Sequence, residues 1–129
     1  SPVAAVHALA YPVGSLFHVP HGLSNALVLA EVMRFNAQVC GADYAELAPH
    51  VFPDINQDRP TEQICEDFIA RLVQLNIDLG LEKGLSQVGI GVGDIERLSS
   101  DAMNQTRLLV NNPREVTLED ARRIYEEAL

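Results

Sequence analysis

The sequence predicts an all-α fold, built as a multi-helix bundle in a single domain over residues 1–129. Apolar residues recur at spacings of three and four along most of the chain, as in helices with a buried face. Prolines and glycines divide the chain into segments of helical length, and no segment has a convincing strand pattern. About five or six helices with short connections are therefore expected.

The first half of the chain is expected to contain two long apolar segments. Ser1-Pro2 resembles an N-cap followed by proline and leads into a helix over residues 3–10. Two prolines and a glycine then predict a loop over 12–20. A broadly apolar helix is expected from His21 to about Val39. Gly41 is predicted to end it, with a short helix over 42–48 and a loop over 49–60 to follow.

Three further helices are expected in the second half, each beginning at a side chain typical of an N-cap, namely Thr61, Asp94 and Thr117. Thr117 and Asp120 have the spacing of a capping box. The predicted helices cover residues 61–79, 94–109 and 118–129. The apolar side chains expected to face inward from the first of them are Ile64, Phe68, Ile69, Leu72, Val73 and Leu75.

The glycine-rich stretch from Gly89 to Asp94 is predicted to be a turn that ends in a helix N-cap. A dinucleotide-binding loop follows a strand and leaves room for a diphosphate at the helix N-terminus. No apolar strand precedes this stretch, and Asp94 places a carboxylate where the diphosphate would lie. The nucleotide site is therefore not expected here.

The charge of the chain excludes some classes of partner. The net charge is −9, and no cluster of Lys and Arg suits a phosphate backbone or an anionic membrane. No apolar run approaches the roughly 20 residues that a membrane crossing needs, and no signal peptide is evident. A cytoplasmic protein that binds neither nucleic acid nor membrane is expected. Cys40 and Cys65 are expected to be small buried apolar residues rather than a metal or redox pair.

Three of the four histidines lie close together in the sequence, at His7, His18 and His21. Helices joined by a proline- and glycine-braced loop can fold back so that His7 and His21 converge. The partial positive charge at a helix N-terminus disfavours an imidazolium at His21, and a metal needs a neutral imidazole nitrogen. The spacing alone is not diagnostic, and the alternative is that these histidines are ordinary capping or surface residues.

The order of residues in this region is more specific. The run His7-Ala-Leu-Ala-Tyr11-Pro-Val-Gly, followed by His21-Gly-Leu-Ser-Asn25-Ala, resembles the second signature of the iron-containing (group III) alcohol dehydrogenases. The stretch from Asn112 to Ala121 is similar to the closing segment of that family. The resemblance covers essentially the whole chain and implies the C-terminal part of the helical domain shared with dehydroquinate synthase-like proteins.

The resemblance implies roles for individual residues. His7 and His21 match two metal ligands of the family. Tyr11 stands where many members have a histidine implicated in proton relay, and it is the expected catalytic residue, although a phenol is a much weaker acid than an imidazolium. Phe17 and His18 are expected to shape the substrate pocket. For His18, an equal alternative is that it caps the next turn.

The resemblance also implies an activity for the intact protein. A divalent metal, iron(II) or zinc, acts as a Lewis acid on an alcohol, and hydride passes to NAD or NADP. The other ligands and the nucleotide-binding domain lie in regions of the family that this sequence lacks. The chain is therefore expected to be a fragment, inactive alone, of an enzyme for small alcohols and aldehydes that forms homo-oligomers. The alternatives are a glycerol dehydrogenase-like enzyme and a metal-free helical interaction module.

Overall fold

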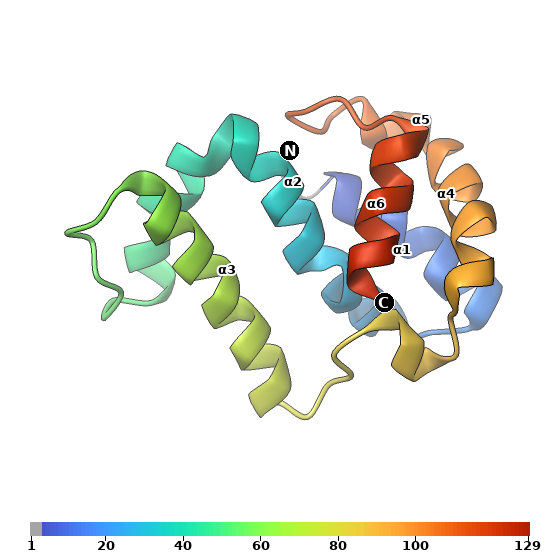
Figure 1. The fold of residues 1–129 in the computed structure, drawn as a ribbon, viewed down its shortest axis with the longest axis horizontal. Coiled ribbons are helices and arrows are strands. Elements are labelled where there is room, and N and C mark those ends of the chain that lie inside the picture. The colour runs from blue at the N-terminus through green and yellow to red at the C-terminus, as the bar shows by residue number, and fades with distance from the viewer. Residues whose placement is uncertain (1–3) are drawn as a thin grey trace.

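Residues 4–129, the part of the chain that the computed structural model describes, form α-helices, short 3-10 helices and loops, without strands (Figure 1). The all-α prediction is confirmed, and the predicted N-cap at Ser1 and Pro2 lies outside the described residues. Within them, no helix is both long enough and apolar enough to cross a membrane. The elements are α1 (Ala4–Phe17), α2 (His21–Val51), α3 (Thr61–Asp78), η1 (Leu85–Val88), η2 (Val92–Asp94), α4 (Ile95–Met103), α5 (Thr106–Leu109) and α6 (Leu118–Ala128).

The first helix is longer than the sequence predicts. The loop expected over 12–20 is wrong, because α1 continues through Pro12 to Phe17 and leaves only residues 18–20 as a connector. Proline inside a helix removes one backbone hydrogen bond and is usually disruptive. Here Pro12 is buried, and its neighbours Leu9 and Val13 are fully buried in the core. Tertiary packing therefore overrides the local preference.

The second helix is also longer than predicted, since Gly41 does not end it. Cys40 departs from helical geometry, with φ −123° and ψ 26°, and α2 continues beyond this kink to Val51. Pro49 lies within the last turn rather than in a loop. The predicted break therefore appears as a bend, and the following loop is confined to residues 52–60.

The N-cap predictions for the later helices have mixed outcomes. Thr117 and Asp120 form the expected capping box at α6, where each backbone N–H donates to the other side chain. Thr61 is the first helical residue of α3 instead of its cap. Asp94 does not cap α4 with its side chain. Its Oδ2 accepts from the N–H of Gly91 at 2.9 Å, so the glycine-rich stretch is a turn before a helix, as predicted.

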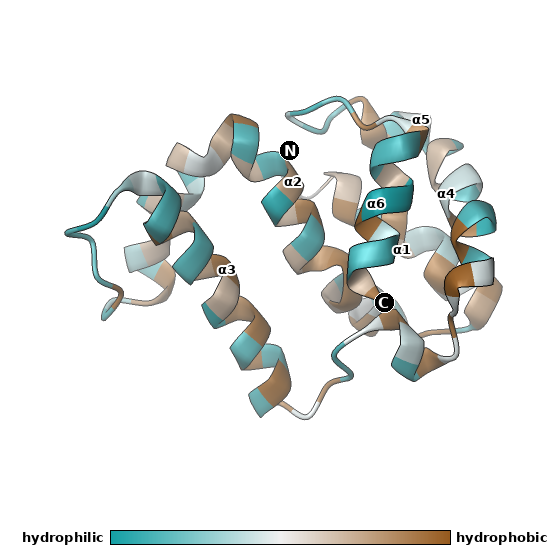
Figure 2. Cartoon of the chain, viewed as in Figure 1, coloured by the Kyte–Doolittle hydropathy of each residue, from teal (hydrophilic) through white to brown (hydrophobic). Residues whose placement is uncertain are grey.

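A large apolar core joins α1, the first half of α2, α4 and α6, and we call it the main core. The outward side of α6 is hydrophilic, as Figure 2 shows, while its inward side buries Ala121, Ile124 and Tyr125. The hydroxyl of Tyr125 donates to the backbone oxygen of Leu9 at 2.6 Å. Burial, more than the nearby Asp101, raises the pKa of this phenol, so the hydroxyl stays a donor. The last helix is thus fastened to the middle of the first.

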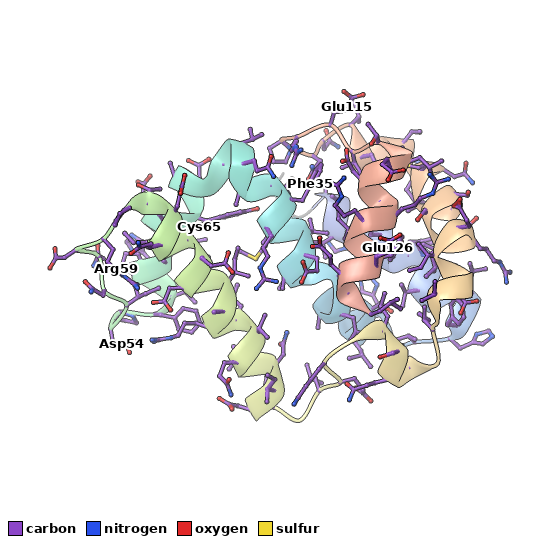
Figure 3. The ribbon with its side chains drawn as sticks, viewed as in Figure 1. Phe35, Asp54, Arg59, Cys65, Glu115 and Glu126 are labelled. Carbon is purple, nitrogen blue, oxygen red and sulfur yellow. The ribbon has the colours of Figure 1, made fainter. Side chains whose placement is uncertain are left out.

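The loop before α6 is attached to α2 by polar contacts. The side chains of Asn36 and Asn112 exchange hydrogen bonds of 3.1 and 2.8 Å. The guanidinium of Arg114 lies over the ring of Phe35, 3.9 Å from its centroid, and donates to the Phe35 carbonyl at 2.9 Å. Figure 3 labels Phe35 on α2. These contacts attach residues 112–117, which form no helix, to α2.

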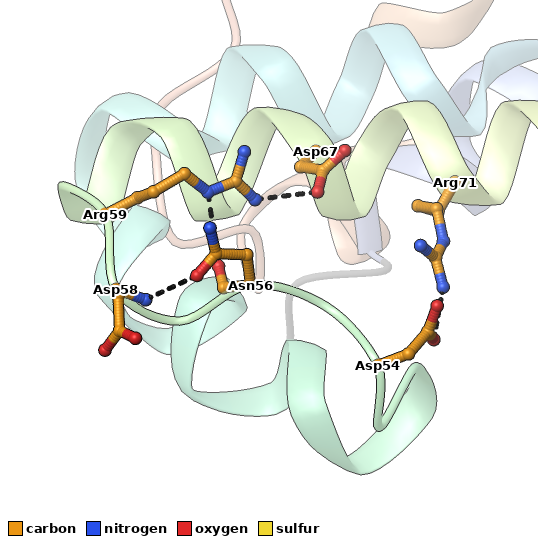
Figure 4. A network of polar contacts seen from close by, with 6 residues as sticks. All are labelled: Asp54, Asn56, Asp58, Arg59, Asp67 and Arg71. Carbon is orange, nitrogen blue, oxygen red and sulfur yellow. Dashed lines mark hydrogen bonds and ion pairs between the residues drawn. The ribbon is translucent and has the colours of Figure 1, made fainter.

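A second, smaller apolar cluster lies between α3 and the end of α2, and we call residues 40–78 the arm. Ion pairs join its loop to α3: Arg59 contacts Asp67 at 2.7 Å and Arg71 contacts Asp54 at 2.5 Å (Figure 4). The inward face of α3 was predicted correctly at its buried residues Ile64, Phe68 and Ile69, whereas Leu75 is 45% exposed. Cys40 and Cys65 are free, buried thiols of this cluster, as expected, and burial raises the pKa of Cys65.

Candidate metal-binding site

The structure brings His7 and His21 together from two different helices. His7 lies on the second turn of α1 and is half-buried, whereas His21 is the exposed first residue of α2. The two imidazole rings are nearly parallel, with an interplanar angle of 8° and 5.8 Å between their centroids. The convergence expected from the sequence is therefore present in the fold.

The short connector between α1 and α2 determines how closely His7 and His21 approach each other. The hydroxyl of Ser24 donates to the backbone oxygens of Val19 and Pro20 at 3.3 and 3.0 Å and so closes the first turn of α2. Gly14 lies so close to the connector that an added Cβ would come within 3.3 Å of the Val19 carbonyl oxygen. Gly14 therefore allows α2 to start close beside α1, instead of breaking α1 as predicted.

His18 gives the connector its sharp change of direction. Its φ is 58°, in the left-handed region that is uncommon for residues other than glycine, and it directly follows the last residue of α1. This conformation is the usual way for a helix to end. The backbone of His18 thus ends α1, and its imidazole is exposed. Its two expected roles, at the substrate pocket or as a cap of the next turn, stay predictions.

The other predicted site residues lie along the same helix. Tyr11 is one turn beyond His7 on α1 and is 57% exposed. Phe17, the last residue of α1, is half-buried against the main core. A groove of about 410 Å³ lies elsewhere, between α2, α3 and the C-terminal residues, and none of the five predicted residues lines it.

The sequence analysis did not predict structural roles for two residues of the site, Ser24 and Asn25. Ser24 follows Pro20 by four residues, and such a hydroxyl commonly bonds back to the preceding turn, so that signal was present. Asn25 was noted only as part of the motif. Its Nδ2 lies 3.3 Å from Nε2 of His21, and its Oδ1 is buried without a hydrogen-bond partner among the described residues.

The donor chemistry of this pair fits a transition-metal ion, since imidazole nitrogen is a common ligand for zinc and iron. Within residues 4–129, however, no group of three or more His, Cys, Asp or Glu side chains is arranged around one point. Zinc sites usually have four ligands. The fold and the site together show a helical domain that brings two histidines side by side, fewer than the four ligands usual for zinc.

Comparison with known proteins places this domain in a family. Residues 1–129 match the description "Fe-containing alcohol dehydrogenase family, C-terminal", and the chain belongs to this family. It is 33% identical over 123 residues to lactaldehyde reductase of Escherichia coli (strain K12), covering 95% of this chain and 32% of that protein. It is 37% identical over 128 residues to long-chain-alcohol dehydrogenase 1 of Geobacillus thermodenitrificans (strain NG80-2), covering 98% and 32% respectively.

Solved structures of the same class share the fold. A 1,3-propanediol oxidoreductase superposes with a TM-score of 0.89 at 27% identity, over 97% of this chain and 32% of the other. An alcohol dehydrogenase from Oenococcus oeni gives a TM-score of 0.89 at 28% identity, over 96% and 32%. The chain thus spans about a third of the length of the relatives that it matches.

Proposed function

We propose that His7 and His21 are metal ligands in a nicotinamide-dependent alcohol dehydrogenase that interconverts alcohols with aldehydes or ketones. The observation that carries the proposal is the parallel placement of two imidazoles, 5.8 Å apart, from two helices of the main core. Membership of the family supports the activity, and so do the names of the relatives, which include a lactaldehyde reductase and a long-chain-alcohol dehydrogenase.

The ion is proposed to be iron(II) or zinc, because imidazole suits both. Its further ligands, and the residues that bind NAD or NADP, would come from parts of the full-length protein outside these 129 residues. When bound, the ion would supply a Lewis acid for the alcohol oxygen. The contribution of this chain is to hold two imidazoles in fixed positions, one on α1 and one at the start of α2.

Three neighbouring residues have proposed roles toward the substrate. Phe17 and His18 would border the pocket from the end of α1. Tyr11 would present its hydroxyl one helical turn from His7, and its 57% exposure leaves that hydroxyl able to reach a bound molecule. A homo-oligomer in the cytoplasm remains a prediction for the full-length protein.

The test is metal content and nicotinamide-linked alcohol oxidation by the full-length protein, supplied with iron(II) or zinc. His7→Ala and His21→Ala should each abolish metal retention and activity. His50→Ala is the matched control, because His50 is an exposed histidine in the arm, and it should leave both unchanged. Near-normal metal content in either ligand variant would contradict the assignment.

The same experiment separates the alternative functions. Metal binding without oxidation of any alcohol in a broad panel would favour a synthase-like relative, and a strong preference for glycerol would favour a glycerol dehydrogenase-like enzyme. A helical interaction module should fold and bind its partner unchanged in chelator. Family membership favours the dehydrogenase over this module.

The role of Tyr11 has its own test. Tyr11→Phe removes one exposed hydroxyl and should lower turnover and alter its pH profile, while metal content stays normal. If turnover and the pH profile are both unchanged, Tyr11 serves packing and has no part in the reaction.

A further inference from the structure

The apolar face of α3 continues beyond the part that the fold covers. In the first half of the helix, Ile64, Phe68 and Ile69 are buried in the second cluster, against the end of α2. The same stripe continues at a spacing of four through Val73 and Ile77, which are only half-buried. Among the described residues, these two pack against neither of the apolar cores. The second half of α3 thus presents an apolar face that residues 4–129 do not cover.

This uncovered face is one wall of the groove of about 410 Å³, which we call the α2–α3 groove. Figure 1 shows the second half of α3 standing apart from α6. The first half of α2 forms the opposite wall with apolar side chains that include Leu29 and Ala30. Leu29 is itself only half-buried, although it contacts both the main core and the second cluster. The groove is therefore apolar on two sides and lies between the main core and the arm.

The charged residues that line the groove are more acidic than basic. Glu31, Glu82 and Glu127 line it together with Arg34 and Lys83. Arg34 is already paired with Glu31, at 2.7 Å. Burial, and then a hydrogen bond with Glu127, raise the pKa of Glu31, as expected where two carboxyl groups lie close together. A basic side chain on a molecule in the groove would relieve the repulsion between these acids.

The shape of the groove and the length of the relatives indicate what fills it. A second copy of this chain, related by two-fold symmetry, would place the same surface against itself. Two concave surfaces do not fill each other, so the occupant must be a different, convex element. The chain spans only 32% of the lactaldehyde reductase and 32% of the 1,3-propanediol oxidoreductase that it matches. Most of the length of each relative therefore lies outside the matched region and can supply such an element.

We propose that an amphipathic helix from another part of the same full-length protein occupies the α2–α3 groove. Its apolar side packs against Val73 and Ile77, and a Lys or Arg on its polar side lies near Glu127. A helix of this kind presents three to four apolar residues over roughly two turns, which matches the two uncovered turns at the end of α3. It joins the arm to the main core. The proposal is independent of the role of His7 and His21 as metal ligands.

The first test compares Ile77→Glu with Leu75→Glu in the full-length protein. Leu75 is the matched control, because it lies on the same helix, is 45% exposed and does not line the groove. Ile77→Glu should lower the melting temperature by about 5 °C or more, because it places a charge in a covered apolar contact. Leu75→Glu should change it by only about 1–2 °C, as for a surface substitution. Equal shifts for the two variants would overturn the proposal.

Thiol labelling measures the coverage without relying on a destabilised variant. Ile77→Cys and Leu75→Cys are treated with a maleimide in the folded full-length protein, and peptide mass spectrometry reads the labelled position. The cysteine at position 77 should react about 10-fold or more slowly than the one at position 75, because it reacts only when the covering helix opens. Similar rates would show that the groove is open to solvent, and the proposal would be wrong.

Photo-cross-linking identifies the occupant. Lys83 is exposed at the groove, so Lys83→Cys can carry a benzophenone attached through a maleimide. Irradiation should join it to a peptide outside residues 1–129 of the same chain, and that peptide should have apolar residues three and four apart. A product with the mass of two chains on a denaturing gel would assign the groove to a second copy and overturn the proposal. Cross-links confined to residues 1–129 would show that no other segment fills the groove, and they would overturn it too.

Discussion

The main core and the arm are both built on α2 and differ in what holds them together. In the main core, contacts join the two ends of the chain: Tyr125 reaches Leu9, and Asn112 reaches Asn36. The arm pairs α3 with the adjacent end of α2, and its loop is fastened by ion pairs at the surface. Both histidines of the candidate site belong to the helices of the main core. The candidate site thus lies in the region that is held together by contacts between segments distant in sequence.

Truncation of one buried side chain in each region should give the largest effects. Leu9→Ala and Phe68→Ala each remove a nearly fully buried side chain, and each should lower the free energy of unfolding by about 2–5 kcal/mol. Only Leu9→Ala, between His7 and Tyr11 on α1, should also weaken metal binding. Denaturant titration and metal affinity of the folded full-length proteins measure the two effects. Equal loss of affinity in both variants would show that the arm and the site are coupled.

Removal of one hydroxyl tests the link between α6 and α1. Tyr125→Phe deletes the donor to the Leu9 carbonyl and should lower the free energy of unfolding by about 1 kcal/mol. Tyr11→Phe is the control for stability, since it removes an exposed hydroxyl from the same helix that receives the bond. Thermal unfolding of both variants measures the difference. Equal stabilities would mean that this hydrogen bond contributes nothing to the main core.

Glycine at the connector should have a smaller effect of the opposite sign. His18→Gly relieves a left-handed backbone and should raise the free energy of unfolding by up to about 1 kcal/mol. Ser15→Gly, at an exposed position inside α1, should lower it by about 1 kcal/mol. Denaturation curves of the two variants test this. A lower free energy of unfolding for His18→Gly would show that the imidazole stabilises the fold by more than the left-handed backbone destabilises it.

The smallest effects are expected from the surface ion pairs. A hydrogen bond from Arg71 holds the pKa of Asp54 below its ordinary value, and one from Arg122 does the same for Glu96. A carboxyl with a lowered pKa stabilises the fold above its unfolded pKa and loses that contribution as the pH falls through its folded pKa. The stability of Asp54→Asn and Glu96→Gln should therefore depend less on pH below about pH 4. Glu96→Gln should show the larger change, because Arg122 contacts both of its oxygens. Unfolding curves at pH 3 and pH 6 measure how much the free energy of unfolding of each variant changes with pH.

Local chemistry explains which elements were predictable. The capping box of α6 depends on two side chains three residues apart, and it is present as predicted. Pro12 and Gly41 are helix breakers in isolation, yet α1 continues through the buried Pro12, and the break predicted at Gly41 appears as a kink at Cys40 within α2. Whether a helix continues past such a residue depends on its contacts with residues that are distant in sequence. The local sequence pattern does not contain those contacts.

The predictions for the candidate site divide in the same way into those that the sequence supports and those that need the fold. The pairing of His7 and His21 was predicted from the motif and from the loop between them, and the parallel rings are consistent with it. The close approach at Gly14 and the unpartnered oxygen of Asn25 depend on the relative placement of α1 and α2. Residue spacing specifies which groups meet, whereas their orientation follows from tertiary packing.

The bond from Tyr125 to Leu9 has a consequence for biosynthesis. It joins residues 116 positions apart, so all of residues 9–125 must have left the ribosome before the bond can form. Until then, α1 lacks one of the contacts that holds its central turn, and the adjacent histidine has less support. A nonsense codon between His21 and Tyr125 would therefore yield a product that retains both histidines but lacks this hydrogen bond. Loss of metal retention in such a shortened protein would be a folding defect, since His7 and His21 are both still encoded.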